Sequence, residues 1–169
     1  SPGTGMERLE TIRVTRDSSD QRKGRAGRTA PGLCMRLWTE DEDRTIKEKS
    51  TPEILEADLA PLALELFAWG VKDPSTLKWL DPPPLSAMSQ AKELLGHLGA
   101  IDGNETITPH GNAISRLPLH PRLGHMVVKG AETGAGALAC LLSALLMERD
   151  IFKDRKDTDL RQRLHYLTG

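Results

Sequence analysis

Aromatic residues and cysteines are scarce in this sequence of 169 residues. Phe, Trp and Tyr together make up 4% of it, so aliphatic side chains must fill the cores that its 38% of hydrophobic residues can build. The two cysteines, Cys34 and Cys140, lie far apart. Because small disulfide-stabilised secreted proteins carry many more cysteines, we expect two reduced thiols in a cytoplasmic protein.

Long apolar runs and metal-ligand patterns are also missing. There is no run of 18 apolar residues and no signal peptide, so we expect no membrane partner. No C-x-x-C pair occurs, and His120 and His125 lie five positions apart around Pro121, which does not suit two ligands on one helix face. The sequence therefore predicts no metal site. The net charge of −1 excludes a nucleic-acid binder that is basic overall.

Two nucleotide-binding motifs are absent as well. Neither the phosphate loop G-x-x-x-x-G-K-[ST] nor a D-E-x-H sequence occurs. The chain also opens abruptly with Ser1-Pro2-Gly3-Thr4-Gly5. We therefore expect a fragment of a longer protein, unable to form a complete ATP site alone.

The most informative stretch is an octet with the sequence Q-R-K-G-R-A-G-R, which contains four cations. If it is helical, Gln21, Arg25 and Arg28 lie at positions i, i+4 and i+7 and share one face. The rigid guanidinium fork of arginine matches phosphate oxygens, and glutamine can orient a water molecule or donate to a γ-phosphate. The spacing therefore predicts a site that stabilises the charge developing on a transferred phosphoryl group.

Gly24 and Gly27 separate these side chains and leave room for a nucleotide or another backbone. Two simpler interpretations remain open. Ser18 and Gln21 fit an S-x-x-Q capping box, in which Gln21 would only cap its own helix. The region from Arg8 to Arg36 has eight Lys or Arg residues against three Asp or Glu, which also suits a solvated basic helix or a nucleic-acid patch.

Periodicity predicts a small α/β arrangement in residues 1–50. Alternating apolar residues predict strands over 10–15 and 33–39, and the octet lies on a helix between them. The charged stretch 40–49 predicts a short solvated helix. Strand–helix alternation of this kind is typical of a parallel layer, in which functional loops follow the strand ends.

The remainder of the chain is predicted to be mainly helical, which makes the fold class mainly α with a small α/β part. Asp58 is expected to cap a helix with Pro61 in its first turn, and Gly70 to end it. A second helix, a turn and a strand over 105–107 complete the pattern of a winged helix. Residues 137–147 are apolar on all sides and predict a buried helix. The expected core positions of the first helical region are Leu55, Leu59, Leu62, Leu66 and Trp69.

Taken with these patterns, the octet resembles the sixth motif, Q-R-x-G-R-A-G-R, of the DEAH-box ATP-dependent helicases. Further segments resemble the region that follows the RecA-like domains in that family, so that the similarity covers essentially the whole chain. The tryptophans and the Glu148-Arg149-Asp150 sequence most resemble the bacterial HrpB type. The matching segments are 51–55, 58–59, 69–70, 79–83, 98–102, 108–111 and 117–123.

The resemblance implies a piece of an ATP-dependent RNA helicase that couples ATP hydrolysis to translocation on RNA or its unwinding. Residues 1–50 would end the second RecA-like domain, 51–117 would form a winged helix, and 118–169 would begin a helical ratchet-like domain. ATP and Mg²⁺ would be bound mainly by upstream residues. The partners implied are single-stranded RNA or DNA and the upstream helicase domains, and the isolated piece would be inactive.

The resemblance also assigns roles within the octet. Gln21, Gly24, Arg25 and Arg28 would contact the nucleotide, with Arg25 and Arg28 as arginine fingers and Gln21 beside the γ-phosphate or the attacking water.

Two other functions remain as alternatives. The chain could be a non-enzymatic adaptor, which would not need these arginines. It could also be a winged-helix reader of DNA, although the second helix is acidic and poor in arginine. Basic residues near the C-terminus could meet phosphates, or they could pair with the neighbouring aspartates.

Overall fold

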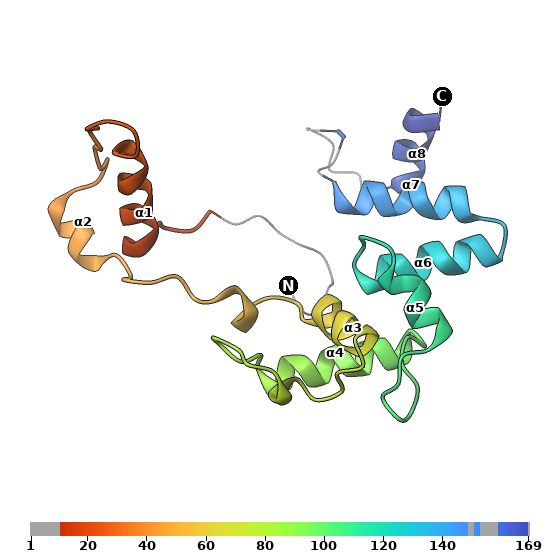
Figure 1. The fold of residues 1–169 in the computed structure, drawn as a ribbon. Coiled ribbons are helices and arrows are strands. Elements are labelled where there is room, and N and C mark those ends of the chain that lie inside the picture. Colours follow the sequence, from red (N-terminus) through yellow and green to blue (C-terminus); the bar gives the residue numbers. More distant parts are fainter. Residues whose placement is uncertain (1–10, 149–150, 153–158, 169) are drawn as a thin grey trace. The chain divides into compact units, whose positions relative to one another are not determined.

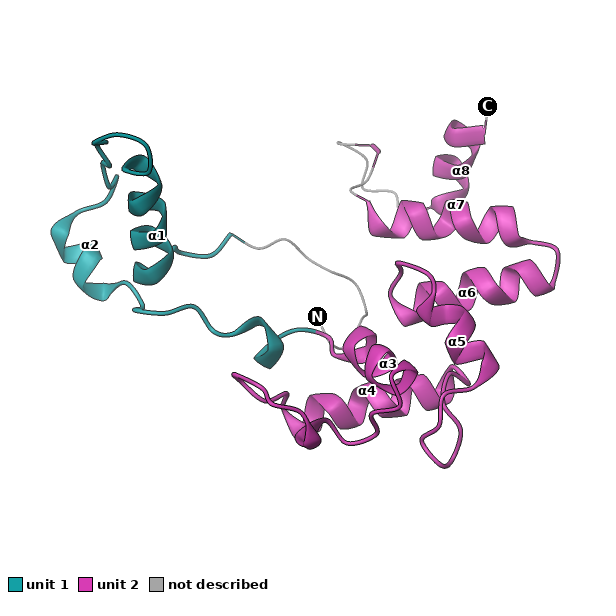
Figure 2. Cartoon of the chain, in the orientation of Figure 1, with its two compact units in different colours: residues 1–57 teal, residues 58–169 magenta. Residues whose placement is uncertain are grey.

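The computed structural model describes residues 11–148, 151–152 and 159–168. These residues form two compact units, 1–57 and 58–169 (Figure 2). Their regular structure is almost entirely helical, which confirms the predicted mainly α fold class. The only β pairing among the described residues is one antiparallel bridge between Ile101 and Ile107. None of the described helices combines the length and the apolar character that crossing a bilayer requires.

The described residues of unit 1, 11–57, form two α-helices and one turn of 3-10 helix. They are α1 (Arg16–Ala26), α2 (Glu40–Thr45) and η1 (Glu53–Leu55). The helix α2 begins with a capping box, in which Thr39 accepts from the Glu42 backbone N–H while the Glu42 side chain accepts from the Thr39 backbone N–H. Four acidic residues in its first turn stabilise the helix, because they interact with the positive end of its dipole.

The two strands predicted in unit 1 are not observed in the part of the chain that the structure describes. Residues 11–15 and 31–37 have no regular secondary structure. A strand needs a hydrogen-bonded neighbour, and the described residues of unit 1 provide none. Apolar residues do alternate along the second predicted strand, but their side chains are not buried. Leu33, Met35 and Leu37 are all strongly exposed, with Leu37 at 94%.

In unit 2 the part that the structure describes forms six α-helices and one 3-10 turn, arranged as in Figure 1. Helix α3 packs against α4, α5 and α6. Helix α6 also packs against α5 and α7, and α7 contacts α8. Their bounds are α3 (Ala60–Ala68), η2 (Pro74–Thr76), α4 (Leu85–His97), α5 (Pro109–Ser115), α6 (Pro121–Glu132), α7 (Gly136–Met147) and α8 (Leu160–Thr168).

Several helix ends in unit 2 follow the sequence signals. The Asp58 carboxylate accepts from the Ala60 backbone N–H at 2.9 Å, next to the proline that opens α3. The Thr108 hydroxyl accepts from the Gly111 backbone N–H at 3.0 Å and caps α5. Gly70 and Gly99 have positive φ angles of 80° and 67°, which let the chain leave α3 and α4.

The core of unit 2 is aliphatic, as the composition requires. Leu95 and Ile114 are fully buried at the centre, where small residues allow the helices to approach closely. A Cβ atom at Gly124 would lie 2.8 Å from Ile114 Cγ2, and one at Gly130 would lie 2.6 Å from the Ala139 Cβ. Glycines at these positions therefore bring α6 against both α5 and α7.

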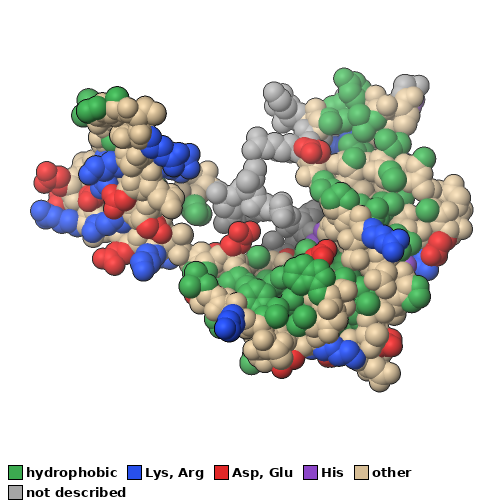
Figure 3. All heavy atoms as spheres, viewed as in Figure 1, with side chains coloured by type: hydrophobic (Ala, Val, Ile, Leu, Met, Phe, Trp, Pro, Cys, Tyr) green, Lys and Arg blue, Asp and Glu red, His purple; other side chains and the backbone are tan. Residues whose placement is uncertain are grey.

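Part of the predicted core is exposed instead. Leu59 and Leu66 are buried as expected, but Leu55 and Trp69 are exposed, Trp69 at 72%. The helix α7, predicted to be buried all round, keeps an exposed apolar side that includes Leu138, Leu146 and Met147. Figure 3 shows hydrophobic side chains on the visible face of this unit. Apolar periodicity identifies the side that can be buried, but not whether a neighbour covers it.

Candidate functional site

The octet lies on α1 and on the turn that follows it. Helix α1 begins at Arg16, earlier than the sequence suggested, because its first backbone N–H groups have partners elsewhere in unit 1. Arg16 N–H donates to the Lys47 carbonyl at 2.9 Å, and Asp17 N–H donates to the Glu48 carbonyl at 3.0 Å. These bonds satisfy donors that a helix N-terminus leaves free.

The N-cap residue of α1 is therefore Thr15, with no side-chain capping bond, and the proposed Ser18–Gln21 capping box is wrong. Ser18 lies inside the helix, and its backbone N–H donates to the Asp17 carboxylate at 2.7 Å. Gln21 is consequently not engaged in capping, and its side chain is exposed.

Three side chains were predicted to form a stripe along one face of the helix, and two of them do. Gln21 and Arg25 lie one turn apart within α1 and are both exposed. The helix ends at Ala26, so Arg28 lies in the turn after the Gly27 C-cap rather than on the helical face. Gly24, also predicted to contact a nucleotide, is inside α1, and a Cβ there would meet no atom within 4 Å.

An open hollow of about 660 Å³ lies beside α1 but is not lined by this stripe. Its walls come from one side of α1, including Lys23 and Gly24, and from the returning segment Gly32–Cys34. A Cβ at Gly32 would lie 2.0 Å from the Ala26 carbonyl oxygen, so glycine is required where this segment passes the end of α1. Gln21, Arg25 and Arg28 do not line the hollow.

The arginines of unit 1 that the structure describes fall into two groups. Arg13 pairs with Glu42 at 2.6 Å, Arg44 pairs with Asp41 at 3.5 Å, and Arg16 and Arg36 both pair with Asp43. In contrast, the cations of the octet make no ion pair with any residue that the structure describes. They are Arg22, Lys23, Arg25 and Arg28, all exposed. Figure 3 shows the mixed acidic and basic surface of this unit.

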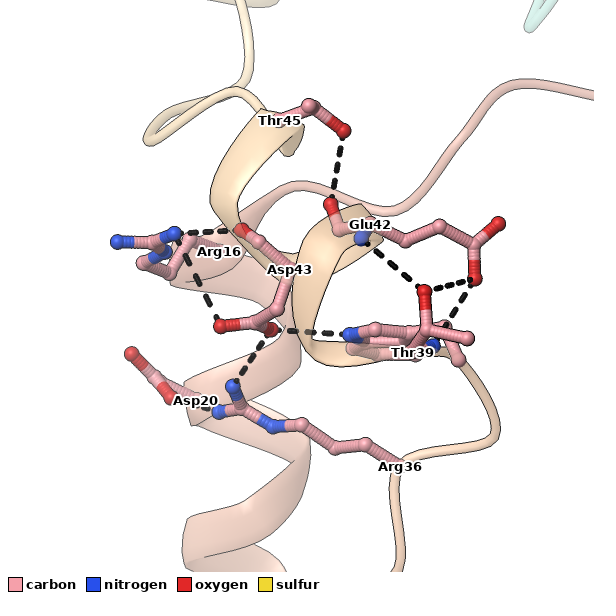
Figure 4. A network of polar contacts seen from close by, with 8 residues as sticks. Arg16, Asp20, Arg36, Thr39, Glu42, Asp43 and Thr45 are labelled. Atoms are coloured by element: carbon pink, nitrogen blue, oxygen red, sulfur yellow. Dashed lines mark hydrogen bonds and ion pairs between the residues drawn. The ribbon is translucent and has the colours of Figure 1, made fainter.

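A polar network around Asp43 joins α2 to α1 (Figure 4). The Asp43 carboxylate accepts from Trp38 Nε1 at 2.9 Å and from Arg36 at 3.2 Å. Arg36 also forms an ion pair with Asp20 of α1, and Arg16 donates to the Asp43 carbonyl oxygen at 2.6 Å. The hydrogen bond from Trp38, together with the nearby Arg36 and Arg16, holds the pKa of Asp43 below its usual value.

Sequence reasoning missed this network. The available signal was the reversal of charge from the basic region before residue 36 to the acidic run at 40–43, which suggested attraction but no specific partners.

In unit 2, two histidines from adjacent helices share a short contact. His110 Nε2 lies 2.9 Å from His125 Nδ1, which is also 3.1 Å from the Leu98 carbonyl oxygen. Because a carbonyl only accepts, this arrangement favours a proton on His125 Nδ1 and leaves His110 Nε2 as an acceptor. Burial is the main cause of the lowered pKa of His110, and His125 and Lys129 lower it further.

The described part of unit 2 builds no metal-binding cluster, and two arginines near its C-terminus have protein partners. No group of three or more His, Cys, Asp or Glu suited to a metal ion occurs among the described residues. Near the C-terminus, Arg161 pairs with Asp159 at 2.7 Å, and Arg163 is buried with NH1 donating to the Asp159 carbonyl at 3.0 Å. The other basic residues noted there lie outside the described residues. They are Arg149, Lys153, Arg155 and Lys156.

Comparison with known proteins identifies the relatives of this chain. No protein-family model matches it. It is 40% identical over 147 residues to the ATP-dependent RNA helicase HrpB of Escherichia coli K12, a match that covers 87% of this chain and 18% of HrpB. A crystal structure of the Escherichia coli DEAH/RHA helicase HrpB aligns with a TM-score of 0.76 and 36% identity, over 99% of this chain and 22% of that one.

The chain belongs to the DEAH-box helicase family, in its HrpB type. A eukaryotic relative supports the wider family: the probable ATP-dependent RNA helicase DHX35 homolog of Caenorhabditis elegans is 38% identical over 149 residues, 88% of this chain and 20% of that protein. The chain thus spans about a fifth of the length of the curated relatives it matches. The likeness to HrpB extends through both compact units, because it covers almost every residue.

Proposed function

We propose that this chain works as part of a longer ATP-dependent RNA helicase, in which ATP hydrolysis drives translocation on RNA or its unwinding. The names of its relatives, ATP-dependent RNA helicases from bacteria and animals, support this assignment. Residues 1–50 would complete the second RecA-like domain, residues 51–117 would form a winged helix, and residues 118–169 would begin the helical ratchet-like domain.

The observation that carries the proposal is the selective pairing of the described arginines in unit 1. Acidic residues of α2 neutralise arginines outside the octet, whereas Arg25 and Arg28 have no carboxylate partner among the described residues. Arginine cannot lose its charge at physiological pH, and its donor fork fits phosphate oxygens. An anion from outside the described chain, such as a triphosphate, is therefore the natural partner of this group.

Each residue of the site would have a distinct role. Arg25 on α1 and Arg28 on the following turn would donate to oxygens of the γ-phosphate as charge develops on the transferred group. Gln21, one turn before Arg25, would orient the attacking water or donate to a γ-phosphate oxygen. Gly24 lies between them in sequence, and its missing side chain would leave room beside α1 for the nucleotide.

ATP and Mg²⁺ would be held mainly by other residues of the longer protein. The described residues contain no acidic cluster that would bind a metal ion, so the roles proposed for Gln21, Arg25 and Arg28 involve no metal ligand.

Single-stranded nucleic acid, with RNA expected and DNA as an alternative, would be bound through its backbone and without sequence preference. A sequence-reading role for α4 is less well supported. Lys92, a cation of that helix, is already paired with the Glu105 carboxylate at 2.8 Å. Major-groove recognition depends on free arginine, lysine or amide side chains.

The proposal is tested by replacing the two arginines in the full-length protein that contains this sequence. Arg25→Ala and Arg28→Ala should each lower kcat for RNA-stimulated ATP hydrolysis by about 10³-fold, because an arginine finger acts on the transition state. Circular dichroism should show that both variants stay folded, since neither side chain has a partner within the described chain.

Arg22→Ala is the matched control, because Arg22 is an exposed cation of the same helix that lies off the Gln21–Arg25 face and makes no ion pair with a described residue. It removes the same charge and should change hydrolysis much less. If Arg25→Ala and Arg28→Ala both turn over ATP at the wild-type rate, the proposed role of the octet is wrong.

A further inference from the structure

The helix that carries Gln21 and Arg25 is fixed to the rest of unit 1 by polar contacts in its first two turns. Its first turn is held by the two backbone hydrogen bonds from Arg16 and Asp17, at 2.9 and 3.0 Å. One turn later, Asp20 is held by its ion pair with Arg36. Since successive residues of an α-helix are rotated by about 100°, Gln21 and Arg25 lie about 100° and 140° around the helix from Asp20. The side chain of Asp20 therefore points away from the face on which Gln21 and Arg25 would meet phosphate.

Asp43 is the centre of that attachment (Figure 4). Its carboxylate accepts from both Trp38 and Arg36, and its backbone carbonyl accepts from Arg16. Arg36 reaches Asp43 with one terminal nitrogen and Asp20 with the other. The guanidinium thus bridges α2 to the middle of α1, and its direction is set by a carboxylate that Trp38 orients.

We propose that Asp43 and Arg36 are positioning residues for the hydrolytic site, which fix the rotation of α1 and so aim Gln21 and Arg25 at the phosphate. This inference rests on the function proposed above. Neither residue belongs to the octet, and both act through the bridge to Asp20. Asp43 anchors the Arg36 guanidinium to α2, and Arg36 in turn holds Asp20 of α1.

The rotation of α1 matters because side chains lie far from its axis. At a radius of about 6 Å, a rotation of about 10° moves the end of a side chain by about 1 Å. A misplacement of about 1 Å at a reacting group can cost about 10²-fold in rate. Loss of the bridge would therefore lower kcat without removing any group that binds ATP.

The test uses Asp43→Asn in the full-length protein, because asparagine keeps the shape and can still accept from Trp38 but loses the ion pair with Arg36. We expect kcat for ATP hydrolysis to fall by about 10-fold to 10²-fold, with KM for ATP and the affinity for RNA unchanged. Asp41→Asn is the matched control. It removes a carboxylate from the same helix, but one whose partner is Arg44, also on α2, rather than a residue of α1. It should leave kcat at the wild-type value.

A double-mutant cycle separates positioning from a general structural role. If Asp43 acts through Arg25, the loss of kcat caused by Asp43→Asn should largely disappear in an Arg25→Ala background, measured by single-turnover hydrolysis. An equal loss in both backgrounds would overturn the inference, and so would wild-type kcat in Asp43→Asn. If Asp43→Asn proves poorly folded, Asp20→Asn replaces it. That change breaks only the α1 end of the bridge and should lower kcat in the same way.

The two proposals fail in different ways. If the octet does not act on phosphate, Arg25→Ala itself will be active. If only the positioning inference is wrong, Arg25→Ala will be inactive while Asp43→Asn and Asp20→Asn hydrolyse ATP normally.

Discussion

Replacing Gly111 with alanine tests how tightly α5 packs against the turn that precedes it. A Cβ atom at this position would lie 2.1 Å from the Ala100 carbonyl oxygen and 2.8 Å from Ile107 Cγ1. Ordinary van der Waals contact begins at 3.4 Å, so the helix or the turn must shift by the difference, about 1.3 Å. Ala100 is fully buried, and its carbonyl accepts from the Thr108 backbone N–H at 2.9 Å.

The expected cost follows from these contacts. The shift breaks or weakens the Thr108–Ala100 hydrogen bond, worth about 1 kcal/mol, and leaves a buried acceptor short of a partner at a further cost of about 1–3 kcal/mol. Alanine in place of glycine returns up to about 1 kcal/mol through its better helix propensity. The free energy of unfolding of unit 2 should therefore fall by about 1–3 kcal/mol.

Gly96→Ala provides a control with the opposite sign. Gly96 is an exposed residue of α4, and a Cβ there would meet no atom within 4 Å. The same substitution should raise stability by about 0.5–1 kcal/mol, because only the helix propensity changes. Urea unfolding of the chain, followed by far-ultraviolet circular dichroism, measures both variants. A Gly111→Ala protein as stable as Gly96→Ala would refute the packing described for α5.

Two further predictions concern acidification and RNA binding. Since the pKa of His110 is lowered in the folded chain, the unfolded chain binds more protons below about pH 6.5, and stability should fall on acidification from about pH 7 to about pH 5. His110→Gln should reduce this fall in urea midpoints, while replacement of the exposed His97 should leave it intact. The isolated chain should bind single-stranded RNA no better than about 10⁻⁵ M at physiological salt, because its net charge is −1 and non-specific affinity depends on excess positive charge. Fluorescence anisotropy with labelled oligo-U measures this affinity, and nanomolar, sequence-selective binding would instead favour a winged-helix reader.

Local chemistry in the sequence was a good guide to helix ends. Gly70 ends α3 with a positive φ angle, as predicted, and Asp58 binds the first backbone N–H of α3, although the N-cap residue is Leu59. In each case the signal and the structure depend on residues within a few positions of one another. Such contacts form whenever the helix forms, whatever its neighbours are.

Features that depend on distant partners were not predictable in the same way. Leu33, Met35 and Leu37 alternate as in a strand, yet a strand is defined by a neighbour that the described residues do not supply. Trp69, expected to lie in the core, is 72% exposed for a similar reason. The sequence pattern shows which side chains can be buried, and the neighbouring elements determine which of them are buried.

The same distinction explains what the sequence revealed of the candidate site. The spacing of Gln21 and Arg25 placed both on one face of a helix because that relation is local. The position of Arg28 depended on where α1 ends, a boundary that spacing alone does not define. Asp43 was missed because its partners lie 5 to 27 positions away, so only the three-dimensional structure brings them together.

The distribution of ion pairs in unit 1 links its folding to its proposed role. Exposed cations cost little in water, so arginines of the octet that lack a partner among the described residues would not by themselves indicate a site. What distinguishes them is that nearby carboxylates of unit 1 pair with arginines outside the octet instead. Glu42 and Asp43 bind arginines that precede or follow the octet, and Asp20, adjacent to Gln21, binds Arg36 instead of a cation of the octet. The acidic side chains thus hold α1 in place while the cations proposed to bind phosphate keep their full positive charge, which would favour an arriving triphosphate.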